Sequence, residues 1–184
     1  MNKKTEAAPD SWDMVTCGLH WISAIWVTGL LGLGLVMVNL VAASGPKFEL
    51  YQLHKSWGFV FGIVLIARLV WKLFVQRPKA LGAGVLHKAG VANQNVMLVM
   101  LLVLVVSGYA LASFSIIPIP IQILGWNVPA LLSSDMVMEQ RATAVHHVIA
   151  FALIILVFAH SGAALFHHFV LKDRTLARML KKSS

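Results

Sequence analysis

The chain has 184 residues, of which 59% are hydrophobic and 12% are charged, and its formal net charge is +8. In a typical soluble domain about 25% of residues are charged, so this composition favours a membrane protein. The positive residues lie near the ends of apolar stretches and form no broad basic face, which argues against nucleic-acid binding. The single cysteine, Cys17, excludes an internal disulfide and a cluster held by four thiolates of this chain.

Four apolar stretches are long enough to cross the hydrocarbon core of a lipid bilayer, which is about 30 Å thick and needs about 20 helical residues. They run from about Leu19 to Ala42, Leu53 to Phe74, Asn95 to Phe114 and Ala144 to Phe166, with prolines between them. The sequence therefore predicts an all-α integral membrane four-helix bundle over residues 19–170. A polar segment, residues 1–18, precedes the bundle, and a basic tail, residues 171–184, follows it.

Lysines and arginines near the ends of these stretches are distributed unevenly. One side of the expected bundle has Lys3, Lys4, Lys72, Arg77, Lys79, Lys88, Lys172, Arg174, Arg178, Lys181 and Lys182, and the other has Lys47, Lys55 and Arg141. The positive-inside rule then places the N- and C-termini in the cytoplasm and the loop of residues 115–143 on the outer side. Because this loop is apolar, we expect a short amphipathic element along the membrane surface, with Trp126 among the headgroups.

Two histidines of the fourth stretch carry the strongest chemical signal. His146 and His160 are 14 residues apart, which is about 21 Å along a helix and brings both side chains within about 40° of one face. Ionisable side chains within membrane spans are energetically costly, so they usually serve a pathway or a cofactor. The spacing suits two cofactors at different depths of the membrane.

Each of these histidines has a partner at its expected depth. His54 opens the second stretch on the outer side, like His146, and His20 opens the first stretch on the inner side, like His160. Two imidazole ligands leave a haem iron six-coordinate, which favours electron transfer over oxygen binding. The pattern predicts two haem b groups, one ligated by His20 with His160 and one by His54 with His146. For any single histidine the alternative is an interfacial side chain bonded to a backbone carbonyl.

Arg68 is a further candidate for the cofactor site. It follows His54 by 14 residues, which places it at the inner level, and no acidic residue lies in any of the four stretches. A buried guanidinium requires an anion, and a haem propionate would accept two parallel hydrogen bonds from it. The alternative is that Arg68 extends inward to lipid phosphate together with Lys72.

The remaining histidines have weaker cases. His147 points about 100° away from His146, but it is 13 residues from His160, close to a whole number of turns, and stays an alternative ligand. We expect the others to contact headgroups or solvent, or to lie in a basic loop: His87, His167 and His168.

Several segments together form a family pattern. They are Leu19-His20-Trp21, Leu53-His54-Lys55 with its 14-residue step to Arg68, and the ending His160-x6-His167-His168-x3-Lys172-Asp173-x-Thr175-Leu176-x-Arg178-Met179. With them the chain resembles the bacterial cytochrome b561 family, short four-helix membrane cytochromes related to hydrogenase b subunits, from about Trp12 to Leu180. The resemblance implies a multi-pass protein of the bacterial inner membrane and the same haem ligand pairs.

The chain departs from some members of this family near the start of the third stretch. Those members carry a histidine there, where this chain has Asn93, Gln94 and Asn95. A proton or quinone role of that region is therefore not carried over.

The resemblance implies two kinds of function. One characterised member is a superoxide oxidase that passes electrons from outer-side superoxide to ubiquinone, and others carry electrons for a separate partner. We expect an electron carrier that exchanges with the quinone pool or a periplasmic redox partner. Superoxide oxidation is the alternative. A site for this anion would favour a positive outer surface, and acidic residues offset the few outer positive charges. A metal or proton transporter is a further alternative, although transporters more often show broken helices.

Overall fold

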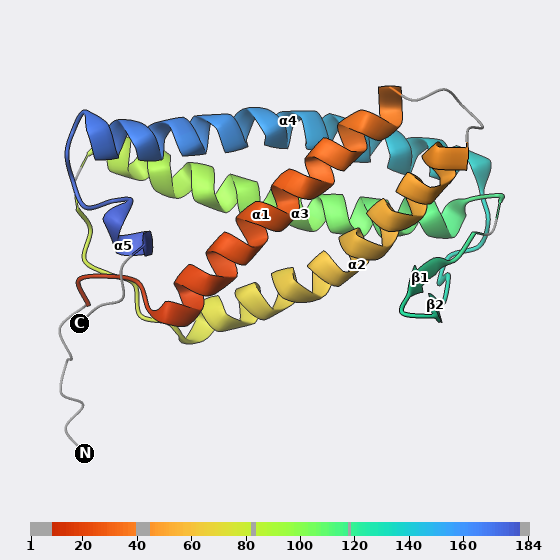
Figure 1. Cartoon of the computed structure of the whole chain (residues 1–184), viewed down its shortest axis with the longest axis horizontal. Coiled ribbons are helices and arrows are strands. Elements are labelled where there is room, and N and C mark those ends of the chain that lie inside the picture. The colour runs from red at the N-terminus through yellow and green to blue at the C-terminus, as the bar shows by residue number, and fades with distance from the viewer. Residues whose placement is uncertain (1–8, 40–44, 82–83, 118, 181–184) are drawn as a thin grey trace, which may run out of the picture.

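Four long helices form the protein, and a computed structural model describes its residues 9–39, 45–81, 84–117 and 119–180. The helices are α1 (Met14–Asn39), α2 (Gly45–Phe74), α3 (Val85–Phe114) and α4 (Met136–Phe169). Helices α3 and α4 lie side by side, and α1 and α2 run obliquely across them (Figure 1). A short antiparallel pair of strands, β1 (Ile121–Ile123) and β2 (Trp126–Val128), precedes α4, and a short helix, α5 (Ala177–Leu180), follows it.

The bundle has two ends that differ in what covers them. We call the end with the start of α1 and with α5 the terminal end, and the end with β1 and β2 the hairpin end (Figure 1). Within the described residues, each of the four helices is long and apolar enough to cross a membrane. The prediction of a four-helix membrane bundle is confirmed.

The helices are longer than the apolar stretches predicted from the sequence. Helix α3 begins at Val85 rather than near Asn95, and α4 begins at Met136 rather than near Ala144. The apolar stretches begin later in the sequence than the helices do, because the first turns of these helices contain polar residues and extend beyond the hydrocarbon core. At Asp135 the side chain accepts hydrogen bonds from the first backbone N–H groups of α4, which fixes that start. The predicted end of the first stretch at Ala42 lies outside the described residues.

The short element expected in the outer loop is a β-hairpin. Ile121 pairs with Val128 and Ile123 with Trp126, and Leu124 and Gly125 between them both have positive φ, as a two-residue type I′ turn requires. Lys55 and Gln52 of α2 donate hydrogen bonds to carbonyls just before β1, those of Ile119 and Pro120. Each strand has only three residues, so the alternation of apolar and polar residues is too short to predict a strand rather than a helical turn from the sequence.

The described core lies midway along the bundle. Val27, Phe61, Leu65, Leu101 and Leu153 form one buried cluster to which all four long helices contribute. Gly62 lets α2 approach α3 closely, because a Cβ atom there would lie 2.9 Å from a methyl group of Val105. Large apolar side chains on the outer faces are exposed, as lipid-facing residues of a spanning bundle are.

Candidate functional site

The terminal-end pair consists of His20 on α1 and His160 on α4. Their ring centroids are 6.2 Å apart, and the ring planes are inclined by 59°. Arg68 of α2 lies beside them, with Nη2 3.3 Å from Nδ1 of His20. The indole ring of Trp21 packs edge-on against His20 at a centroid distance of 5.4 Å. The chain therefore brings a cation and an aromatic ring next to this pair of imidazoles.

The hairpin-end pair consists of His54 on α2 and His146 on α4. Their ring centroids are also 6.2 Å apart, with the planes inclined by 79°. The Oγ atom of Ser107 on α3 lies 3.1 Å from Nδ1 of His146. Nδ1 of His54 is buried and has no hydrogen-bond partner among the described residues.

The spacing of both pairs fits a metal ion held between two imidazoles. A metal bonded to a ring nitrogen at about 2.0–2.1 Å lies about 3 Å from the ring centre, so two such rings on opposite sides of it have centroids about 6 Å apart. Within the described residues, no group of three or more histidine, cysteine or acidic side chains could hold an ion. A pair of axial ligands is what a haem iron takes from a protein, since the macrocycle supplies its other ligands.

Small residues make room beside the hairpin-end pair. A Cβ atom at Gly108 would lie 3.1 Å from Cε1 of His146, and one at Gly34 would lie 3.6 Å from Cε1 of His54. A larger residue at position 108 would displace the imidazole of His146. The donor set, the ring spacing and these glycines all fit a haem with two histidine ligands.

The two pairs lie one at each end of the buried core. Leu153 is halfway between His146 and His160 in the sequence of α4, and it is fully buried. Phe61 is likewise halfway between His54 and Arg68 in the sequence of α2, and it is buried as well. An apolar layer therefore separates the two pairs.

The other histidines belong to neither pair. His147 is exposed on α4, unlike His146, and His87 and His168 are exposed as well. His167 contacts Asp173, with Nδ1 2.5 Å from Oδ2. His147 as an alternative ligand finds no imidazole partner in the described structure. The sequence analysis did not identify Ser107 and Gly108 as site residues. The feature that could have indicated them is a serine–glycine pair within an apolar span.

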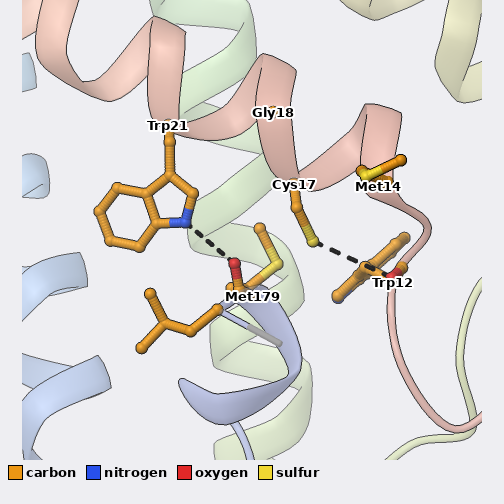
Figure 2. A pocket seen from close by; sticks show the side chains of 7 residues that line it. Trp12, Met14, Cys17, Gly18, Trp21 and Met179 are labelled. Carbon is orange, nitrogen blue, oxygen red and sulfur yellow. Dashed lines mark hydrogen bonds between the residues drawn. The ribbon is translucent and has the colours of Figure 1, made fainter. Parts of the chain in front are cut away.

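The tail after α4 folds back on the start of α1 at the terminal end. Trp21 donates a hydrogen bond of 2.9 Å from Nε1 to the carbonyl of Met179, as Figure 2 shows. The Cys17 thiol lies 3.7 Å from the carbonyl of Arg178. A cavity of about 470 Å³ opens here, and its lining is Trp12, Met14, Cys17, Gly18, Trp21, Met179 and Leu180 (Figure 2). Because Trp21 also contacts His20, this cavity reaches the vicinity of the terminal-end pair.

Comparison with known proteins places the chain in a family. It is 34% identical over 179 residues to cytochrome b561 homolog 2 of Escherichia coli K12, an alignment that covers 96% of this chain and 94% of that protein. It is 26% identical over 166 residues to cytochrome b561 homolog 1 of the same organism, covering 89% and 93%. The family described as prokaryotic cytochrome b561 matches residues 11–182. The chain therefore belongs to the prokaryotic cytochrome b561 family, multi-pass electron-transfer proteins of the bacterial inner membrane that bind haem b.

Proposed function

We propose that the protein is a diheme b-type cytochrome that moves electrons across the bacterial inner membrane and exchanges them with the quinone pool. The observation that carries the proposal is the presence of two histidine pairs with the same 6.2 Å ring spacing at opposite ends of one bundle. Two sites at different depths divide the membrane into shorter electron-transfer steps. A single site would suffice for chemistry at one surface.

Four histidines are the proposed axial ligands. His20 and His160 would hold one haem, and His54 and His146 would hold the other. Each bound haem supplies an iron that takes up and releases one electron. With two imidazoles from this chain as its ligands, a haem would serve electron transfer rather than oxygen binding.

Arg68 is the proposed partner of a haem propionate. A guanidinium has only donors, and the described structure shows one of them directed at Nδ1 of His20. The other N–H groups are free to bind a carboxylate in the bidentate manner that arginine favours. Its half-buried position within a span supports this role over the alternative contact with lipid phosphate.

The orientation follows from the distribution of positive residues. Besides Arg68, seven described lysines and arginines lie at the terminal end, and three lie at the hairpin end. By the positive-inside rule the terminal end faces the cytoplasm and the hairpin end faces the periplasm. The histidine pair near the hairpin would then be the outer site.

The cavity beside Trp21 supports electron exchange with a quinone on the cytoplasmic side. Its volume of about 470 Å³ lies within the range of small-molecule sites, and tryptophan, methionine and leucine side chains make up most of its lining. An electron leaving the terminal-end pair would meet a quinone there next to Trp21.

Superoxide oxidation is the second candidate function. Lys55, whose ammonium group donates a hydrogen bond to the Ile119 carbonyl beside the hairpin, adds a positive charge at the outer end of the bundle, where it would favour the approach of an anion such as superoxide. An outer protein partner is the remaining possible electron donor.

Two measurements test the proposal. A pyridine haemochrome assay of fully loaded protein should give two haem b per chain, and a ratio of one would contradict the diheme assignment. In liposomes with quinone inside the bilayer and a superoxide source outside, rapid haem reduction with quinone-dependent reoxidation would support the superoxide oxidase function. Reduction by an added protein donor alone would favour a carrier subunit. Failure of every donor would contradict both functions.

A further inference from the structure

Ser107 bonds two groups at once, and this fixes the direction of its hydrogen bonds. Its Oγ lies 3.2 Å from the carbonyl oxygen of Leu104, one turn earlier in α3, and 3.1 Å from Nδ1 of His146. A carbonyl oxygen can only accept, so the single hydroxyl proton of Ser107 goes to Leu104. The Ser107 oxygen is then the acceptor, and Nδ1 of His146 is the donor.

This assignment also decides which ring nitrogen of His146 is left for a metal. A neutral imidazole that carries its proton on Nδ1 has its lone pair on Nε2, the nitrogen that is left to bind a metal. The surroundings on α3 therefore select the metal-binding tautomer.

The orientation of the ring is restricted by the neighbouring residue. Gly108 packs so closely on His146 that an added Cβ would come within 3.1 Å of Cε1 and 3.4 Å of Nδ1. The dipeptide Ser107-Gly108 thus provides both a hydrogen-bond acceptor and a flat surface for the imidazole. Helix α3, which supplies none of the four histidines, determines how one of them is presented.

We propose that Ser107 is a positioning residue for His146, which fixes its tautomer and strengthens it as an electron donor to the iron of the hairpin-end haem. This inference rests on the proposed diheme function. Metal-bound histidines commonly donate their second ring nitrogen to an acceptor, which raises the basicity of the ligand. A more basic imidazole stabilises the ferric over the ferrous state, so Ser107 should lower the potential of the outer site.

At the terminal end the donor and acceptor roles are reversed. Arg68 can only donate, so Nδ1 of His20 is the acceptor in the described structure. When His20 binds an iron through Nε2, its ring proton lies on Nδ1, so Arg68 would turn from this nitrogen toward the propionate. In either position Arg68 supplies no acceptor for a ring proton at Nδ1. The effect of Ser107 is therefore specific to the hairpin-end pair.

The test is a redox titration of the full-length purified protein with both haems resolved. Ser107→Ala should keep both haems but favour the ferrous form of the hairpin-end haem about tenfold, a rise in potential of about 59 mV for one electron. Ser107→Thr keeps the hydroxyl and should restore the wild-type potential. The electron paramagnetic resonance signal of the ferric hairpin-end haem should change in the alanine variant and return in the threonine variant.

Ser113→Ala is the matched control, since Ser113 is also a buried serine of α3 but makes no hydrogen bond to either histidine pair among the described residues. Equal potentials in Ser107→Ala and this control would overturn the proposal, as would a shift that Ser107→Thr does not restore. If the alanine variant fails to assemble, Ser107→Cys, with its weaker acceptor, should give a smaller shift in the same direction, and an unchanged potential would overturn the proposal. Wild-type protein lacking a second haem would instead contradict the diheme function itself.

Discussion

The two histidine pairs have the same ring spacing but different surroundings. The terminal-end pair lies beside the guanidinium of Arg68, and the hairpin-end pair lies beside the hydroxyl of Ser107. A nearby positive charge favours the reduced state of a bound iron, whereas an acceptor on the ligand favours the oxidised state. Identical ligands can thus give two different potentials, and here we expect the higher one at the terminal end. Electrons would move from the periplasmic to the cytoplasmic side.

The largest effect should come from removing a ligand, which separates the two sites completely. His54→Ala or His146→Ala should remove the hairpin-end haem, because one axial bond to it is lost, and leave the other haem in place. His20→Ala or His160→Ala should do the reverse. The measurement is the haem content per chain together with the spectrum of the remaining haem. His147→Ala is the control and should retain both haems, and loss of a haem in this variant would show that the ligand on α4 is misassigned.

The next effect tests the charge at the terminal end. Arg68→Gln should lower the potential of the terminal-end haem by about 59 mV, which corresponds to a tenfold change in the one-electron equilibrium. The cause is the loss of a positive charge beside the reduced site. Lys72→Gln, at the same end of α2 but hydrogen-bonded to Asn95, should change the potential less. Equal shifts in both variants would mean that general surface charge, and not Arg68, sets the potential.

The pH dependence of the tail should be a smaller effect. Partial burial would raise the pKa of the Asp173 carboxyl, but hydrogen bonds from His167 and Thr175 outweigh it and lower this pKa to about 2. Because the pKa is lower in the folded protein than the unfolded value of about 3.9, the carboxylate stabilises the tail above pH 4. This contribution should be lost as the pH falls from about 4 to about 2. Limited proteolysis of the tail measures it.

Asp173→Asn is the variant that checks the assignment. It should make the tail equally susceptible to protease at neutral and acidic pH, while the haem content stays unchanged. A pH dependence that persists in this variant would assign the effect to another group.

The smallest effect concerns the bond between Trp21 and the tail. Trp21→Phe removes the donor to Met179 but keeps an aromatic ring beside His20. An exposed neutral hydrogen bond contributes about 1 kcal/mol at most, so the tail should separate from α1 only slightly more often. The rate at which a maleimide labels Cys17, which lies next to the Arg178 carbonyl, measures that separation. Thr28→Val, elsewhere on α1, is the control, and equal labelling rates in both variants would contradict the role of Trp21.

The sequence predicted the parts of the site that depend on helix periodicity. The 14-residue steps from His146 to His160 and from His54 to Arg68 correspond to nearly whole numbers of turns, so the depth of each side chain follows from local geometry. The structure brings together the histidines that this reasoning paired. Their role as haem ligands stays a prediction that the substitutions above test.

The contacts between helices could not be predicted in this way. The position of Ser107 against His146 depends on the rotation of α3 relative to α4, which no spacing within α3 determines. The hairpin and the docking of α5 on α1 depend likewise on tertiary contacts of short segments. These are the features that distinguish one end of the bundle from the other.

The apolar layer around Leu153 and Phe61 has an electrical consequence. No acidic side chain lies within the described spans between the two sites, so an electron that crosses the layer has no titratable carboxylate to carry a proton with it. The transfer would then be electrogenic. The sites are about 21 Å apart in a core of about 30 Å, so each electron would cross about two thirds of the membrane potential, or about 1.5 kcal/mol per 100 mV. The membrane voltage itself would therefore oppose an electron moving inward and slow its transfer in an energised cell.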